Sequence, residues 1–210
     1  MKFTLTYDGE LKASGNSPKP KEKWTIRQAL HPQLMELWQT HPVLSRTDPR
    51  IPAEGGYWSI EQHHSVQPSD PSPPKPEEIR LCAPINVGRA NFVPLVRNSM
   101  ALVCHLDILF LRKEEPGKLV QKGGDLDNRI KTLFDGLRMP KRDELRFASD
   151  PIESPFHCLL EDDALITGFR VTTGHLLTRP NGNIKEVRLV IDVTVKVTHV
   201  RQYNLPLLGD

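Results

Sequence analysis

The sequence lacks the features that would place this chain in a membrane, in an oxidising compartment or among nucleotide-binding proteins. No apolar run reaches the roughly 20 residues of a membrane span, and the N-terminus has no charged-then-apolar signal pattern. The three cysteines, Cys82, Cys104 and Cys158, are odd in number and widely spaced, which argues against a disulfide framework. No glycine-rich phosphate loop is present. We therefore expect a cytoplasmic protein with reduced thiols and no membrane partner.

Hydrophobic residues are also scarce, at 38% of 210 residues, while prolines number 19. A chain of this length forms either one domain with a sizeable core or a smaller core with long insertions, and this composition favours the second. Five of the nine residues from Pro68 to Pro76 are proline, which predicts an extended excursion. We expect one domain over 1–210, whose core is about 96–200 plus an N-terminal strand and helix. The expected insertions are about 41–94 and 138–159.

The chain also has little excess of one sign of charge, because its formal net charge is only +2. The distribution is uneven, however: residues 112–146 contain ten Lys or Arg and seven Asp or Glu, an excess of three positive charges. Such an excess permits a polyanionic partner without requiring one.

The first forty residues predict one strand and helical structure. Lys2–Tyr7 alternates apolar and polar residues, which is typical of a half-buried strand, and Asp8-Gly9 is expected to end it. Trp24–Leu30 and Gln33–Trp38 have helical spacing, with Pro32 suited to a first turn. We expect one kinked helix or two short ones.

Leu102–Leu111 is the clearest candidate for a central strand, and both of its faces are expected to be mostly covered. His105 and Asp107 interrupt its apolar character. They are interpreted as a hydrogen-bonded pair at i, i+2 in preference to a lining of an active site, because buried polar groups usually find partners.

The C-terminal part predicts two more strands. Residues 164–177 and 184–200 alternate in hydrophobicity, and Asn181-Gly182 between them is a strong turn signal. We therefore expect a hairpin, and an α+β fold in which a mixed sheet packs against a few helices and carries long Pro-rich and polar insertions.

Between the central strand and this hairpin, Asp125 to Leu137 predicts an amphipathic helix. Its apolar residues recur at i, i+4, i+7, i+8 and i+11, which places them on one stripe. Asp125 would lie at the N-terminal end, while Asp127 and Lys131 would lie beside the stripe with Asn128 and Asp135. An acidic pair, Asp162-Asp163, follows about 25 residues after the helix.

Each acidic pair has a structural explanation of its own. Asp125 would cap the helix, Asp127 would complement its dipole, and Asp162-Asp163 would form a polar turn. An EF-hand loop is excluded, because its fifth, sixth and twelfth positions would be Arg129, Ile130 and Gly136.

In combination, the two motifs resemble a known family. The order D-L-D-N-x-x-K-x-x-F-D-x-L, followed by L-x-D-D-A-x-I, is similar to that of the RusA family of Holliday junction resolvases. The resemblance implies a RusA-like fold, with Asp125, Asp127 and Asp163 as the catalytic metal ligands and Lys131 as a further catalytic residue. Asn128 and Asp162 are candidates for orienting those ligands.

The resemblance also implies an activity. It predicts a homodimeric endonuclease that uses Mg²⁺, with Mn²⁺ as a substitute, to hydrolyse branched DNA during recombination and repair. Gly123-Gly124 replaces the arginine-rich approach expected before the first motif, so a flap, fork or RNA substrate remains an alternative. A non-catalytic nucleic-acid or protein-binding module is the second alternative.

Histidines offer two weaker metal hypotheses. The vicinal pair His63-His64 lies in the Pro-rich region without partners at helical or hairpin spacing, so a surface loop is the preferred interpretation. Cys104-His105 and His157-Cys158 together suggest a Cys/His zinc site as a further hypothesis. Residues 138–159 are interpreted as either a DNA-contacting lid or a variable surface loop.

Overall fold

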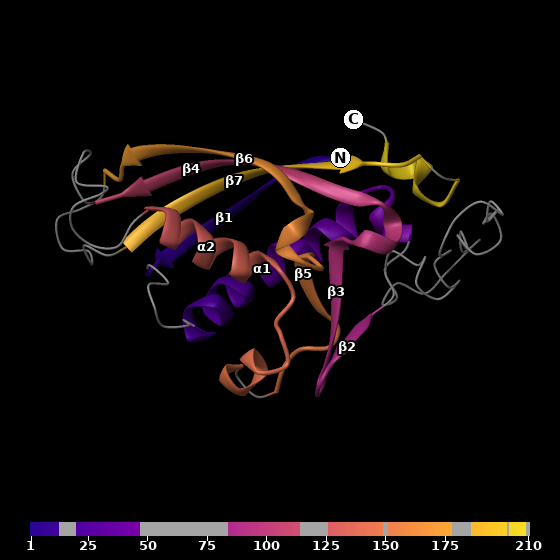
Figure 1. Ribbon diagram of the computed structural model, residues 1–210, viewed down its shortest axis with the longest axis horizontal. Helices are drawn as coiled ribbons and strands as arrows, with labels where there is room; N and C mark the ends of the chain where they lie inside the picture. Colours follow the sequence, from indigo (N-terminus) through magenta and orange to yellow (C-terminus); the bar gives the residue numbers. More distant parts are fainter. Residues whose placement is uncertain are drawn as a thin grey trace.

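A computed structural model of the chain describes residues 1–12, 20–46, 84–113, 126–148, 151–177, 186–200 and 202–208. These residues form an α+β fold in which two mixed sheets pack with two helices (Figure 1). The larger sheet has the order β1 (Lys2–Glu10), β7 (Glu186–Val197), β4 (Leu102–Arg112) and β6 (Ile166–His175). The smaller sheet has the order β2 (Ile85–Val87), β3 (Ala90–Val96) and β5 (Phe156–Leu160). The helices are α1 (Pro20–Thr40) and α2 (Leu126–Leu137).

The helices and the smaller sheet all lie on one side of the larger sheet (Figure 1). The described residues also form short 3₁₀ helices: η1 (Leu44–Arg46), η4 (Asn98–Met100), η5 (Glu144–Phe147) and η6 (Asp163–Leu165) lie between the main elements, and η7 (Gln202–Leu207) follows β7. Neither α1 nor α2 is long and apolar enough to cross a membrane, and no other helix among the described residues is.

β4 is the central strand of the larger sheet, as the sequence predicts. It pairs with β7 on one side and β6 on the other. Its inward side chains are buried, but the alternate side chains are only partly covered, and Leu109 is 39% exposed. The expectation that both faces are mostly covered therefore holds fully for the inner face and only in part for the outer face. Both helices pack on the inner face, and none of the described residues forms a layer over the outer face.

The predicted hairpin between β6 and β7 is also wrong. β4 lies between these two strands, pairing in parallel with β6 and antiparallel with β7. Alternating hydrophobicity shows that a segment has one buried face, but it does not show which strand lies beside it. The turn signal Asn181-Gly182 lies outside the described residues.

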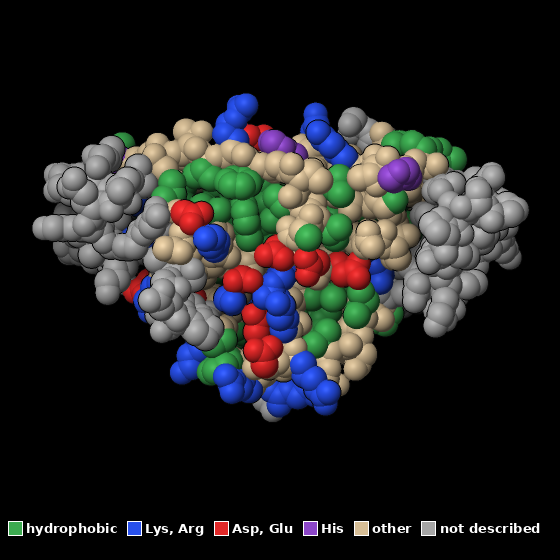
Figure 2. Space-filling model, viewed as in Figure 1, with side chains coloured by type: hydrophobic (Ala, Val, Ile, Leu, Met, Phe, Trp, Pro, Cys, Tyr) green, Lys and Arg blue, Asp and Glu red, His purple; other side chains and the backbone are tan. Residues whose placement is uncertain are grey.

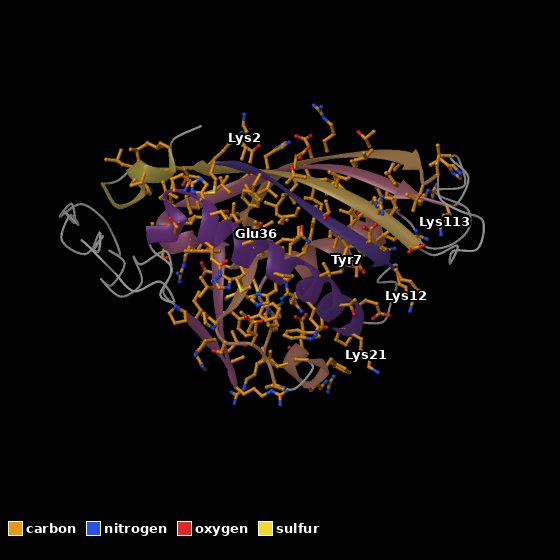
Figure 3. The ribbon with its side chains drawn as sticks, turned by 180° about the vertical axis from the view of Figure 1, so that it is seen from behind. Lys2, Tyr7, Lys12, Lys21, Glu36 and Lys113 are labelled. Carbon is orange, nitrogen blue, oxygen red and sulfur yellow. The ribbon has the colours of Figure 1, made fainter. Side chains whose placement is uncertain are left out.

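The N-terminal elements are longer than predicted. β1 continues through Asp8-Gly9 to Glu10, because its antiparallel pairing with β7 extends to Glu186. α1 is a single helix that contains Pro32. It runs beneath β1, with Tyr7 directed toward it in the view from behind (Figure 3). The Gln33 side-chain amide accepts a hydrogen bond from the Thr6 backbone N–H at 2.9 Å and donates one to the Thr6 carbonyl oxygen at 2.8 Å.

The segments expected to be insertions contain structural elements. Residues 138–159 contain η5 and most of β5, and every residue of β5 is buried. Residues 41–94 contain η1, β2 and part of β3. The side chains that fill the smaller core come from both regions and from α1: Trp24, Ala90, Phe92, Leu145, Phe156 and Cys158. Residues 138–159 are thus not simply a lid or surface loop, whereas Pro68–Pro76, His63, His64 and Cys82 lie outside the described residues.

α1 and α2 make their closest approach at a glycine. A Cβ atom placed on Gly136 of α2 would lie 2.7 Å from Cγ2 and 2.8 Å from Cβ of Ile26 on α1. These distances are too short for non-bonded carbon atoms, and a branched side chain cannot move aside freely near its Cβ atom. Gly136 therefore sets the spacing of the two helices.

Gly136→Ala is expected to destabilise the protein by about 1–2 kcal/mol. Overpacking of a core typically costs about 1–3 kcal/mol, and the better helix propensity of alanine returns up to about 1 kcal/mol. Urea unfolding of the single variant and of Gly136→Ala in an Ile26→Ala background measures this. In the Ile26→Ala background, Gly136→Ala should lower the free energy of unfolding less than in the wild type, or should raise it. An equal loss of stability in both backgrounds would contradict the proposed contact.

Candidate functional site

The apolar stripe predicted for α2 is confirmed. Ile130, Leu133 and Leu137 are buried in the main core, and Leu126 and Phe134 pack against it. The described part of the helix begins at Leu126, so Asp125 lies outside the described residues. The stripe fixes how α2 is rotated about its axis, and this rotation decides which of its polar side chains reach the surface.

Asp127 and Lys131 lie together on the exposed side of α2. Their side chains are each 63% exposed, and Lys131 Nζ is 3.0 Å from Asp127 Oδ2, one helical turn away. An exposed pair of this kind contributes little to stability. Asn128 is half-buried, and its carbonyl oxygen accepts a hydrogen bond from Thr132 Oγ1 at 3.0 Å. A carboxylate and an ammonium group therefore lie side by side on the exposed face of α2.

The two residues of the second acidic pair have different environments. The Asp162 side chain caps η6 by accepting a hydrogen bond from the Ala164 N–H at 2.9 Å. Asp163, the first residue of η6, is exposed, and within the described residues its carboxylate has no hydrogen-bond or ion-pair partner. The structural interpretation thus fits Asp162, while the Asp163 carboxylate is available for another interaction.

The fold places η6 against both α2 and β4, although more than 20 residues separate α2 from η6 in the sequence. Figure 2 shows acidic side chains in a band across this face, over α2 and the segment between β5 and β6. No three His, Cys, Asp or Glu side chains among the described residues form a group that could hold a metal ion. The three-carboxylate cluster includes Asp125 and stays a prediction.

A buried ion-pair network at the other end of α2 was not foreseen from the sequence. Lys23 Nζ and Arg138 Nη2 each lie 2.8 Å from a carboxylate oxygen of Asp135. Glu144 is 2.8 Å from Arg27 Nη2 and 3.0 Å from Arg138 Nη2, and both guanidinium groups are buried. The network ties α1, the end of α2 and η5 together, so Asp135 is a structural residue.

Opposing effects determine the ionisation of the two carboxylates in this network. Burial acts to raise the pKa of Asp135, but Lys23 and Arg138 outweigh it and hold the pKa below its usual value. Burial likewise acts to raise the pKa of Glu144, and Arg27 and Arg138 bring it below its usual value. Both residues are therefore ionised at neutral pH, and each neutralises part of the buried positive charge.

His105 and Asp107 lie on the outer face of β4, on the opposite side of the sheet from α2. The His105 Nε2 and Asp107 Oδ2 atoms are 3.8 Å apart, beyond hydrogen-bond distance, and Arg170 is 3.7 Å from the same carboxylate. The pair is a partly exposed electrostatic contact, so the predicted hydrogen bond is not formed. These residues do not line the α2 surface.

The two Cys-His pairs that suggested a zinc site do not bring their cysteines together. Cys104 faces the main core, whereas His105 faces outward, and Cys158 belongs to the smaller core. Burial raises the pKa of both thiols to about 12, so neither is a thiolate at neutral pH. Within the described residues this chemistry does not favour zinc.

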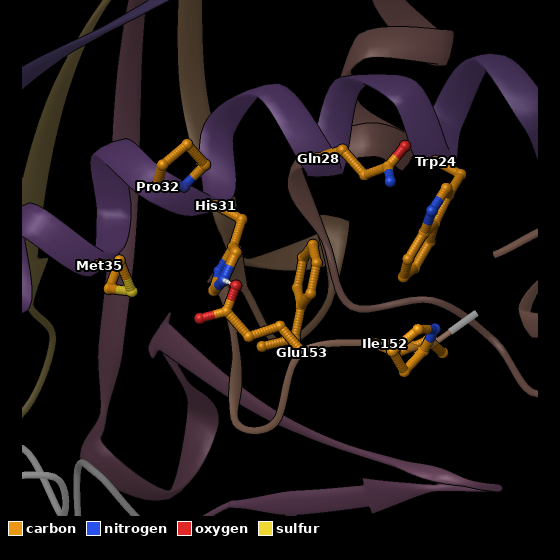
Figure 4. Close-up of a pocket in the computed structure, with 9 residues that line it drawn as sticks. Trp24, Gln28, His31, Pro32, Met35, Ile152 and Glu153 are labelled. Atoms are coloured by element: carbon orange, nitrogen blue, oxygen red, sulfur yellow. Dashed lines mark ion pairs between the residues drawn. The ribbon is translucent and has the colours of Figure 1, made fainter. Parts of the chain in front are cut away.

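A separate pocket of about 350 Å³ lies between α1 and the segment before β5 (Figure 4). His31 stacks on Phe156 at a centroid distance of 4.1 Å, and its Nδ1 accepts a hydrogen bond from the His157 backbone N–H at 2.9 Å. Its Nε2 is 3.1 Å from Glu153 Oε2. Because the Nδ1 lone pair accepts the hydrogen bond from His157, Nδ1 is not available to bind a metal ion.

Comparison with protein-family models, with curated proteins and with solved structures gives no match for this chain. The case for a function therefore depends on the chemistry and the placement of its own residues.

Glu144→Gln is expected to destabilise the protein by about 3–5 kcal/mol at pH 7. The change leaves the buried Arg27 guanidinium group without a carboxylate partner and leaves Arg138 with Asp135 alone, and removing one partner of a buried pair is costly. Asp143→Asn, a change of the neighbouring exposed carboxylate, is the matched control and should have little effect. Chemical unfolding of the three proteins measures the difference, and equal stabilities would contradict the proposed role of Glu144.

The same network predicts a dependence on pH. Because folding lowers the pKa of both carboxylates, their stabilising contribution is present at neutral pH and is lost as the pH falls below their unperturbed pKa values, 4.5 for Glu144 and 3.8 for Asp135. The stability curves of wild type and Glu144→Gln should therefore converge in acid. A constant difference from pH 7 to pH 3 would contradict this assignment.

Proposed function

We propose that this protein is a RusA-like, metal-dependent endonuclease that hydrolyses phosphodiester bonds in branched DNA such as Holliday junctions. The observation that supports this most is the packing of η6, which carries Asp163, against α2, which carries Asp127 and Lys131. Two motifs that are separate in sequence thus belong to neighbouring elements. Asp127 and Lys131 in the first motif and Asp163 in the second are exposed.

The residues present suit a hard divalent cation. Asp127 and Asp163 are exposed carboxylates, and carboxylate oxygens are the ligands that Mg²⁺ prefers, with Mn²⁺ accepted in the same geometry. Asp125 would complete the set. A bound cation would supply charge stabilisation and activation of water for in-line displacement at phosphorus.

Lys131 has two roles in this proposal. In the free protein it neutralises Asp127 at 3.0 Å. With a cation bound to the Asp127 carboxylate, the ammonium group of Lys131 would be free to contact the phosphate that is cut. Asn128 and Asp162 flank these residues and would hold the ligand carboxylates in position.

Lys131→Ala is expected to reduce cleavage about 10²- to 10³-fold, the usual effect of removing one positioned charge from a transition state. Asp163→Asn should abolish cleavage, whereas Asp162→Asn should leave most of it, because asparagine is an equally good cap for η6. Labelled four-way junction, linear duplex and flap substrates are incubated with each variant, in magnesium and in chelator.

The substrates separate the alternatives. Cutting of the flap alone would overturn the resolvase assignment and leave a nuclease, and cutting of RNA alone would do the same. Binding to junction DNA without cleavage by the wild type in magnesium or manganese would favour a non-catalytic module. If Lys131→Ala and Asp163→Asn both cut at the wild-type rate, neither residue has the proposed catalytic role.

We also expect a homodimer, because two symmetric cuts in a four-way junction match a two-fold protein. Light scattering of the protein, free and on junction DNA at micromolar concentration, measures this. A dimer in either state agrees with the proposal. A monomer in both states would favour an enzyme that makes single cuts.

A further inference from the structure

Four exposed cations gather at the end of the molecule that is furthest from the larger sheet. Figure 1 shows η5 beside the turn between β2 and β3 at this end, and Figure 2 shows Lys and Arg side chains over the same region. We define this cluster as the basic tip, whose members are Arg89, Lys141, Arg142 and Arg146. It lies apart from the band of acidic side chains over α2 and the segment between β5 and β6 (Figure 2).

The backbone beneath the basic tip is held firmly. Gly88 adopts a φ of +60° in the turn between β2 and β3, a conformation that favours glycine. A Cβ atom placed on Gly88 would lie 3.1 Å from Leu145 Cδ1 and 3.8 Å from Arg142 Cγ, so the turn packs directly against η5 and the residues before it. Two segments distant in sequence thus present their cations on one surface.

The buried network also positions this surface. Glu144 accepts a hydrogen bond from the Lys141 backbone N–H at 3.1 Å, while its carboxylate pairs with Arg27 and Arg138. The turn that carries Lys141 and Arg142 is therefore fixed to the end of α2. A surface held by its backbone loses little conformational freedom when its side chains bind a partner.

The same network leaves the basic tip with an excess of positive charge. Glu144 is buried and neutralised internally, so Asp143 is the one exposed carboxylate in the 138–148 segment. The Cζ atom of Arg146 lies over the ring of Phe147, 4.7 Å from the ring centroid, which is a favourable cation–π distance. Four exposed cations, with Asp143 as the exposed carboxylate of the 138–148 segment, form a patch that attracts polyanions.

We propose that the basic tip binds the sugar-phosphate backbone of a nucleic acid at a distance from the cut. Three of its four cations are arginines, whose planar guanidinium groups match phosphate oxygens in pairs. None of the exposed large hydrophobic side chains among the described residues belongs to the tip, so it lacks the apolar anchor that a membrane surface or a typical protein interface would need. This inference rests on the proposed function, because a junction nuclease must hold DNA arms that extend beyond its active site.

The test removes three of the cations without touching their backbone. Lys141→Gln/Arg142→Gln/Arg146→Gln is compared with Lys2→Gln/Arg170→Gln/Lys196→Gln, which removes three exposed cations from the outer face of the larger sheet. The two variants have the same net charge. Lys2 projects away from the sheet in Figure 3. Melting curves establish that both variants are folded before binding is measured.

The readout is the affinity for a labelled four-way junction over a range of salt concentrations. Each lost phosphate contact reduces the slope of log affinity against log salt by about 0.9, so three reduce it by about 2.7. The tip variant should bind about 10- to 100-fold more weakly than the wild type at low salt. The control variant should keep most of the wild-type affinity and of the wild-type slope. Cleavage by the tip variant should show a raised KM with little change in kcat, since the cations do not contact the reacting phosphate.

The outcomes separate this inference from the proposed function. If the wild type cuts the junction and the tip variant binds it as tightly as the wild type does, the tip inference is wrong and the nuclease stands. If the wild type binds DNA through the tip but cuts nothing, the tip stands and the nuclease is wrong. Equal losses in both triple variants, or tip-dependent binding to anionic vesicles or polyglutamate without binding to DNA, would also overturn the inference.

Discussion

The structure depends on the burial of one face of β4. Leu102, Cys104, Leu106, Ile108 and Phe110 alternate along this strand and are almost fully buried, and the inward side chains of β7 continue the same surface. An apolar surface of this width must be covered, and the amphipathic stripe of α2 and the apolar residues of α1 cover it from one side. The opposite face carries His105, Asp107 and Arg170 and does not need such a layer. This asymmetry brings α2, α1 and the smaller sheet to the same side.

The polar contribution to this arrangement is concentrated at the junction of α1, α2 and η5. Two buried guanidinium groups and two carboxylates lie there with Lys23 at the edge. Arg27 also donates to the carbonyl oxygens of Asp135 and Arg138 at 2.6 and 2.9 Å, which satisfies the backbone at the C-terminal end of α2. Such a network specifies one geometry, because any other arrangement leaves buried charge without a partner. The stripe sets the rotation of α2, and the network sets the position of its end.

The two proposed functional surfaces differ in how they depend on this core. Asp127, Lys131 and Asp163 are exposed and add little to stability, so the fold tolerates chemistry at their positions. The basic tip is similar, because its cations project from a backbone that Gly88 and Glu144 hold in place. In both surfaces a buried group fixes the backbone and an exposed group is left for a ligand. Binding sites on rigid elements typically have buried residues that hold the backbone and exposed residues that contact the ligand.

Local sequence patterns determined which segments form helices and strands, but not which of these elements pair or pack with one another. The sequence by itself predicted α2 and its buried stripe, the central position of β4, and the exposed edge that carries Asp127 and Lys131, since these follow from the helical period of 3.6 residues and the strand period of 2. It did not predict that β4 separates β6 from β7, because strand alternation is the same for any partner. Nor did it predict that β3 and β5 form a second sheet. The helical period placed Asp135 beside the stripe, but only the packing of α1 against α2 brought Lys23 and Arg27 close to it. Contacts between distant segments depend on which surfaces must be buried together, and that choice is made by the whole core, not by any one stretch of sequence.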